Sequence, residues 1–168
     1  MTLPLTPSQT VGPYFSIGLS RRVENELVPP GTEGVFTLSG RVLDGDGAGV
    51  ADSMVEIWQA DPSGVYRADF GWGRSGTDAD GGYSFATVRP GSVGGQAPHV
   101  VMLVFMRGIL KPVLTRVYFP DEAANASDPV LSGVPEAQRP RLVGAFDGGT
   151  LRFDVRMQGE DQTPFFTL

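Results

Sequence analysis

One histidine, His99, is the residue of this sequence best suited to binding a metal ion. It follows a turn rich in Gly and Pro and begins an apolar run, HVVMLVFMRG, that includes Arg107 near its end. Imidazole is the commonest protein ligand for zinc, copper and iron. Structural zinc needs four Cys or His ligands and a non-haem iron triad needs two histidines, whereas this chain has 1 His and 0 Cys. The residues alone favour a histidine that is hydrogen-bonded at the edge of a core.

Three other motifs suggest chemistry that their surroundings do not support. Residues 71–76 read GWGRSG, but a turn and a strand follow them, where a dinucleotide-binding motif needs a helix. The Asp-Gly turns at 44–47 and 78–82 lack the further oxygen ligands of a calcium loop. No serine lies in a nucleophile elbow beside which His99 could act as a base. We therefore expect no nucleotide site, calcium loop or serine triad.

The elements that position these residues are predicted to be short strands joined by tight turns. The 168 residues include 23 Gly and 14 Pro, which are spread evenly along the chain. Apolar residues alternate in the strands predicted at 36–42, 53–60 and 150–158, and the uniformly apolar run from His99 predicts a strand buried on both faces. The pattern predicts an all-β fold, an antiparallel β-sandwich of seven to eight strands.

The first part of the chain differs from the rest in composition. Residues 1–35 are rich in proline and hold only short apolar runs, so we expect an extended N-terminal arm that lies on another surface. Residues 36–168 are then the sandwich domain. Within it we expect an irregular loop at 68–76 and short helical turns at 121–126 and 135–138.

Charge and hydropathy restrict the partners. The net charge is −6 and the 13 basic residues form no cluster, which argues against nucleic acid and against an anionic membrane surface. The N-terminal residues MTLPLTPSQT have no basic region followed by an apolar core, and no apolar run has the length of a membrane span. We expect a cytoplasmic protein.

Five stretches carry a resemblance to a known family. They read LTPSQTVGPYF (5–15), VEIWQADPSGVY (55–66), TVRPG (87–91), APHVVMLVFMRG (97–108) and TRVYFPDEAA (115–124). Together they resemble the intradiol ring-cleaving dioxygenases over almost the whole chain, including its ending, QGEDQTPFFTL. The resemblance implies a β-sandwich fold and the oxidative cleavage of a catechol ring at ferric iron.

The family's iron is held by two tyrosinates and two histidines, because two phenolates offset much of the Fe(III) charge and one can leave when a catecholate binds. The resemblance places the first tyrosine at Tyr66 and the first histidine at His99. The second tyrosine position is Val93 and the second histidine position is Val101. We refer to these as the four ligand positions. The resemblance implies that this chain has no iron, no other cofactor and no catalytic residue of its own.

The resemblance also implies a partner, because the family's iron-free α subunits pair with an iron-bearing β subunit of like fold. The α arm then helps to wall the β subunit's pocket for an aromatic small molecule, through a Thr-x-Gly-Pro-Tyr segment that is Thr10, Gly12, Pro13 and Tyr14 here. Arg107 corresponds to an arginine at the mouth of that pocket, where its charge attracts a carboxylated catechol.

Other functions stay open at this point. One is a non-catalytic β-sandwich binding or carrier module that self-associates. Another is a symmetric oligomer that pools Tyr66 and His99 from neighbouring chains into one iron site. In that case both side chains would have to reach across an interface between chains. For the pocket residues, the alternatives are an arm that only straps a sandwich and an Arg107 that only ends a strand at the surface.

Overall fold

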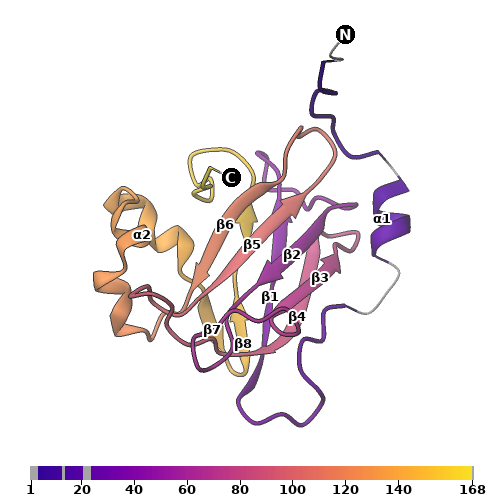
Figure 1. The fold of residues 1–168 in the computed structure, drawn as a ribbon. Coiled ribbons are helices and arrows are strands. Elements are labelled where there is room, and N and C mark those ends of the chain that lie inside the picture. Colours follow the sequence, from indigo (N-terminus) through magenta and orange to yellow (C-terminus); the bar gives the residue numbers. More distant parts are fainter. Residues whose placement is uncertain (1–3, 13, 21–23, 168) are drawn as a thin grey trace.

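The computed structural model describes residues 4–12, 14–20 and 24–167, and its strands form two β-sheets packed face to face (Figure 1). The strands are β1 (Val35–Leu43), β2 (Met54–Trp58), β3 (Trp72–Gly76), β4 (Gly82–Val88), β5 (His99–Phe105), β6 (Val113–Tyr118), β7 (Ala145–Asp147), β8 (Thr150–Arg152) and β9 (Val155–Arg156). The predicted β-sandwich is confirmed. It has nine strands in the described part of the chain, slightly more than the seven or eight expected.

The two sheets differ in how their strands pair. The second sheet, in the order β3-β2-β5-β6, is antiparallel throughout, whereas in the first sheet, β4-β1-β8-β7, strand β1 pairs in parallel with β8 and also with β9. Between β8 and β9 the chain approaches β1 closely, since a Cβ atom at Gly40 would lie 1.7 Å from the Phe153 carbonyl oxygen. The parallel pairings therefore add to the antiparallel architecture that the alternation predicts.

The core lies between the sheets and follows the predicted alternation. Leu38 and Val42 of β1, Phe85 of β4 and Leu151 of β8 are fully buried or nearly so, and they pack against Val100, Met102 and Val104 of β5. The prediction that β5 is buried on both faces was wrong for its outer side. The alternate residues Val101, Leu103 and Phe105 are only half-buried, because the rest of the chain covers that face incompletely.

The prediction of an irregular loop at 68–76 was also wrong, because residues 72–76 form β3. Its backbone pairs with β2, with Trp72 opposite Trp58, and the Arg74 guanidinium lies 2.6 Å from the Glu56 carboxylate. The glycines that make this stretch resemble a loop have a packing role. At Gly73, a Cβ atom would lie 2.5 Å from the Leu27 side chain.

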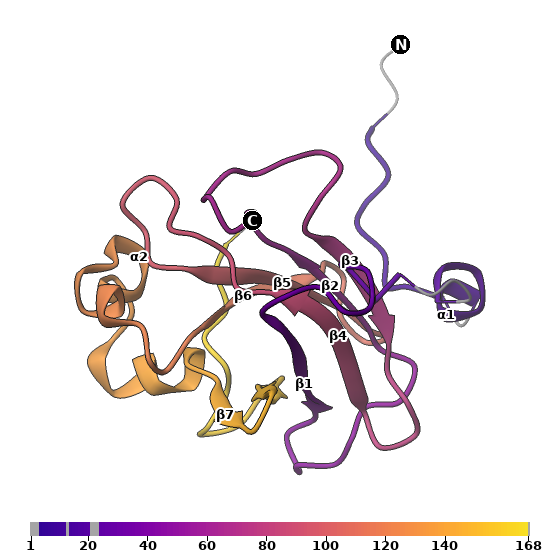
Figure 2. The ribbon, with the colours of Figure 1, turned by 90° about the horizontal axis from the view of Figure 1, so that it is seen from below.

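The N-terminal segment is less uniformly extended than predicted. It contains a short helix, α1 (Tyr14–Leu19), and Glu24 and Glu26 then bridge to Arg74 of β3 and Ala86 of β4. The predicted helical turns are confirmed between β6 and β7 as η1 (Ala123–Ser127) and η2 (Glu136–Leu142), and they flank the additional helix α2 (Pro129–Ser132). These turns lie on the side of the sandwich opposite α1 (Figure 2). Among the described residues, no helix is long and apolar enough to cross a membrane.

Candidate functional site

The four ligand positions gather at the end of the second sheet where β5 begins. Val101 on β5 is the register partner of Trp58. The Trp58 ring packs edge-on against the Tyr66 ring, with the two ring centres 5.2 Å apart. The loop before Tyr66 packs on the loop that holds Val93, and the Gly91 N–H donates to the Asp61 carbonyl at 2.9 Å. The family motifs thus meet in space although they lie far apart in the sequence.

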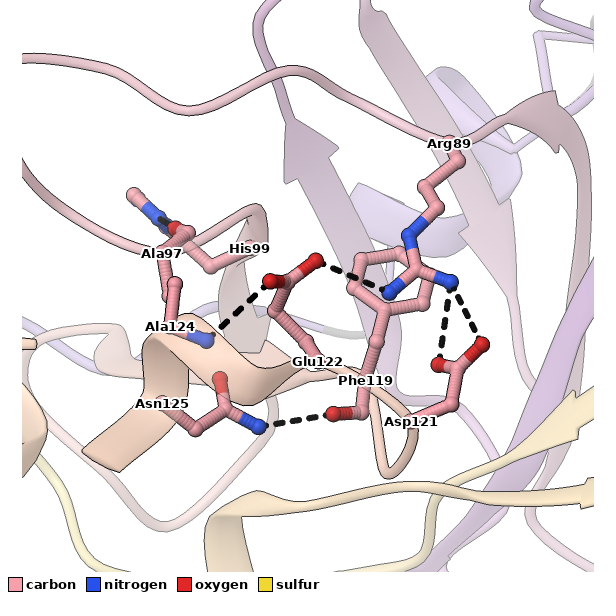
Figure 3. Close-up of polar contacts among 8 residues, drawn as sticks. All are labelled: Arg89, Ala97, His99, Phe119, Asp121, Glu122, Ala124 and Asn125. Carbon is pink, nitrogen blue, oxygen red and sulfur yellow. Dashed lines mark hydrogen bonds and ion pairs between the residues drawn. The ribbon is translucent and has the colours of Figure 1, made fainter. Parts of the chain in front are cut away.

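His99 is buried at the edge of the core, as its sequence context predicts. Its side chain shows no more than 4% exposure, and Nδ1 lies 2.8 Å from the Ala97 carbonyl oxygen (Figure 3). A carbonyl oxygen only accepts, so Nδ1 carries the proton of a neutral ring. Burial lowers the pKa of His99, and the nearby Arg116 charge adds to this effect. In this neutral tautomer, the bond to Ala97 uses Nδ1, and the lone pair of Nε2 takes no part in it.

The side chains at the four ligand positions do not fit a ferric ion held by four protein ligands. Val93 and Val101 have no oxygen or nitrogen donor, which leaves Tyr66 and His99. Burial raises the pKa of Tyr66, which favours the phenol over the tyrosinate that Fe(III) requires. No group of three or more His, Cys, Asp or Glu side chains with metal-binding geometry occurs among the described residues.

An ion-pair cluster fixes the loop that leads to these positions. The Arg89 guanidinium donates to both carboxylate oxygens of Asp121, at 2.8 and 2.9 Å, and to Glu122 at 3.1 Å (Figure 3). Its central carbon lies 4.5 Å from the centre of the Phe119 ring. Arg89 and Asp121 lie in the motifs TVRPG and TRVYFPDEAA, which by themselves predict no role for Arg89. The cluster ties the end of β4 to the segment after β6.

Replacing Arg89 by alanine should lower the free energy of unfolding by about 1 to 2 kcal/mol, because two half-exposed ion pairs and one cation–π contact are lost. Urea unfolding followed by tryptophan fluorescence measures the change. The matched control is Arg152→Ala, whose ion pair with Asp147 is 60% and 75% exposed and should contribute less than about 0.5 kcal/mol. Equal losses in the two variants would show that the cluster has no special role.

A second buried network was missed by the sequence analysis and is centred on Asp128. One carboxylate oxygen accepts from the backbone N–H groups of Val130 and Leu131 and from the Tyr118 hydroxyl, at 2.7 to 3.1 Å. The other accepts from the Ala97 N–H at 2.8 Å. Burial raises the pKa of Tyr118 to about 12, so this hydroxyl stays protonated and donates. The only sequence signal was the Asp-Pro pair, which is typical of a helix N-cap.

The predicted pocket residues lie at the other end of β5. The Thr10 hydroxyl accepts a hydrogen bond from the Gly108 N–H at 2.9 Å, and Arg107 pairs with Asp52 at 3.0 Å in an exposed position. Gly12 is exposed, and the Tyr14 side chain is 79% exposed at the start of α1. Pro13 lies outside the described residues. The structure therefore brings the Thr10 segment beside the Arg107 turn.

These two groups of residues are well separated. The strand from His99 to Phe105 lies between them, and at about 3.3 Å per residue its six steps separate its two ends by about 20 Å. The Thr10 segment of the arm consequently lies at the opposite end of β5 from His99. A small cavity of about 170 Å³ lies between the arm and the turn after β5, and its lining includes Gln9, Val11, Met106 and Leu110.

The sandwich and the gathered family motifs define a member of the dioxygenase family. The family model described as Dioxygenase matches residues 12–159, and the chain belongs to this family. A relative from Burkholderia cepacia, the protocatechuate 3,4-dioxygenase alpha chain, is 44% identical over 99% of this chain and 99% of its own length. The beta chain of that name from the same organism is 32% identical over 96% of this chain and 79% of its own length.

A solved structure supports the fold. The dioxygenase domain of a dioxygenase carbohydrate-binding protein fusion from Streptomyces sp. SirexAA-E superposes with a TM-score of 0.69 at 27% identity, covering 92% of this chain and 98% of that one. Intradiol dioxygenases depend on iron. The question for this chain is therefore which polypeptide supplies the iron ligands.

Proposed function

We propose that this chain is the iron-free α subunit of a protocatechuate 3,4-dioxygenase. In this proposal it completes the substrate pocket of an iron-bearing β subunit, which cleaves 3,4-dihydroxybenzoate with O₂ to 3-carboxy-cis,cis-muconate. The similarity to a named alpha chain over 99% of both lengths carries the proposal. The similarity to a named beta chain fits a partner of like fold, and we place the complex in the cytoplasm.

The proposed work of this chain is to bind and orient the substrate. Residues 1–35 serve as the arm and residues 36–168 as the sandwich domain. Arg107 is exposed and permanently charged, so it attracts and orients the carboxylate of the aromatic substrate. Thr10, Gly12, Pro13 and Tyr14 form the neighbouring wall, where Gly permits close approach and the tyrosine ring covers the planar substrate.

The separation within the chain supports a role in another subunit's pocket. Thr10 and Arg107 lie together just beyond Phe105, the end of β5 that is about 20 Å from His99. Residues that wall a pocket in this chain's own sandwich would have to lie beside the four ligand positions. The arm and the Arg107 turn are therefore best placed to act on a partner that packs at that end.

Arg107→Ala, in the complex with the β subunit, should raise KM for protocatechuate about tenfold, because a charge-assisted contact to the substrate carboxylate is lost. The value of kcat and the iron content should change little. Oxygen uptake and iron analysis of the purified complex measure these quantities. Arg152→Ala, an exposed arginine on β8, is the control and should leave the kinetics unchanged.

The purified chain alone tests the assignment as a whole. It should show no ring cleavage and no visible tyrosinate-to-iron absorption, and co-expression with the β subunit should give both. Unchanged KM in Arg107→Ala would contradict the pocket role while leaving the subunit assignment intact. A chain that self-associates, binds no β subunit and lacks activity would instead favour a binding module.

A further inference from the structure

Asp52 forms an ion pair with Arg107, the residue that we place at the carboxylate of the substrate. The Nη2 atom of Arg107 donates to an oxygen of the Asp52 carboxylate at 3.0 Å. Asp52 lies two residues before Met54 and Arg107 lies two residues after Phe105, and Met54 and Phe105 are partners in the antiparallel pairing of β2 with β5. The ion pair therefore continues the register of these two strands beyond the end of the sheet.

The backbone of Asp52 has a conformation that few residues other than glycine adopt. Its φ angle is +60°, the only positive value at a non-glycine position among the described residues. Thr77 fixes this turn on both sides, because its hydroxyl donates to the Val50 carbonyl and accepts from the Ser53 N–H, both at 2.9 Å. The position of Asp52 is thus set by its neighbours and not by its own side chain.

The Asp52 carboxylate does not stabilise its own turn. In three other turns, the carboxylates of Asp44, Asp61 and Asp78 each accept from two backbone N–H groups within the next four residues. Such local bonds are what usually allow an aspartate to adopt a positive φ. In the described part of the chain, the Asp52 carboxylate bonds to Arg107 instead. A carboxylate at this position is therefore explained by the arginine and not by the turn.

The ion pair leaves most of the Arg107 guanidinium available. A guanidinium has five N–H donors, and among the described residues the only hydrogen bond of this side chain is the one from Nη2. The side chain is 58% exposed. The next residue is held as well, since the Gly108 N–H donates to the Thr10 hydroxyl at 2.9 Å. Arg107 is consequently restrained while several of its donors can still bind a second carboxylate.

We propose that Asp52 is a positioning residue that holds Arg107 in place for the carboxylate of the aromatic substrate. Such an exposed ion pair adds little to stability, because water screens it. Its effect is to restrict the arginine side chain before the substrate arrives, which lowers the entropy cost of binding. Asp52 acts through Arg107 and not on the reacting atoms. The inference rests on the proposed pocket role of Arg107.

Two substitutions of Asp52, made in the complex with the β subunit, test this role. D52G removes the carboxylate but readily keeps a φ of +60°, and D52N keeps both this backbone and an acceptor oxygen. D52G should raise KM for protocatechuate about three- to tenfold, with kcat and iron content nearly unchanged. D52N should stay within about twofold of the parent complex. Asp147→Ala, which removes the carboxylate of another exposed ion pair, is the control and should leave KM unchanged.

Two further measurements distinguish positioning from a general disturbance of the pocket. Catechol has the two hydroxyls of the substrate but no carboxylate, so its constant for competitive inhibition should be equal in the parent and D52G complexes. In an R107A background, D52G should not raise KM further, because the residue that Asp52 positions is already absent.

Four results would overturn the proposal. If R107A raises KM and D52G does not, Asp52 has no positioning role, although the proposed function stands. If R107A also leaves KM unchanged, the pocket role of Arg107 fails as well. A lower KM in D52G would mean that Asp52 competes with the substrate for Arg107. An equal loss of affinity for catechol would mean that the substitution disturbs the pocket as a whole.

Discussion

Replacing Asp128 by alanine is expected to lower the free energy of unfolding by about 3 to 4 kcal/mol, because it leaves buried donors without an acceptor. The carboxylate is fully buried and accepts from three backbone N–H groups and one hydroxyl. It joins β6, the strand that holds Arg116, to the start of α2 and to the loop before His99. Its loss should loosen these three segments together.

Urea unfolding measures the effect, with two variants as comparisons. Asp128→Asn keeps one acceptor oxygen but turns an amide N–H₂ toward one of the donors, so its loss should be intermediate. Asp147→Ala removes an exposed carboxylate of β7 and should cost less than about 0.5 kcal/mol. A loss below about 1 kcal/mol in Asp128→Ala would show that water replaces the carboxylate at little cost.

The contribution of Asp128 should also depend on pH. Burial by itself would raise the pKa of this carboxyl, but the N–H donors of Leu131, Ala97 and Val130 and the Tyr118 hydroxyl outweigh it, and the pKa is lowered. A group with a lower pKa in the folded state stabilises the protein above its unfolded pKa, which is about 3.9. The difference between the parent chain and Asp128→Asn should therefore be largest near neutral pH. It should shrink below about pH 4, as the parent carboxylate is protonated.

The sequence predicted the parts of the fold that depend on side-chain alternation. Leu38 and Val42, one face of β1, are buried as period two requires, and the apolar run of β5 forms a central strand. β3 was missed because its pairing depends on the backbone, while its glycines make room for Leu27. The parallel pairing of β1 with β8 was missed because alternation specifies a face and not the direction of a neighbour.

The site was predicted only where motifs carried it. Tyr66, His99 and the two valines came from the family resemblance, and Thr10 and Arg107 are found beside the same turn. The Asp128-Pro129 pair signals only a helix N-cap, and Arg116 in TRVYF resembles an ordinary outward-facing strand residue. Arg116 pairs with Val101 and bonds to Gln96, and Asp128 accepts from the Ala97 N–H. These partners lie far away in the sequence, so the sequence alone does not predict the contacts.

Gly64→Ala is expected to lower the free energy of unfolding by about 2 to 4 kcal/mol, because both the backbone conformation and the available space require glycine. The φ angle of Gly64 is +84°, and a Cβ atom there would lie 2.1 Å from the Ser92 carbonyl oxygen. That oxygen belongs to the backbone, so the clash can be relieved only if the loop that holds Gly64 moves away from the loop that holds Ser92. The movement would carry Tyr66 away from Val93.

Gly31 separates the two causes, because it has the same φ of +84° but no atom within 4 Å of the added Cβ. Gly31→Ala should therefore cost only the conformational part, about 1 kcal/mol. Urea unfolding gives both values, and the tryptophan fluorescence of folded Gly64→Ala should also change, since the Trp58 ring contacts Tyr66 at 5.2 Å. Equal losses at Gly64 and Gly31 would mean that the two loops separate at no cost. The close packing between them would then not be what holds Tyr66 in place.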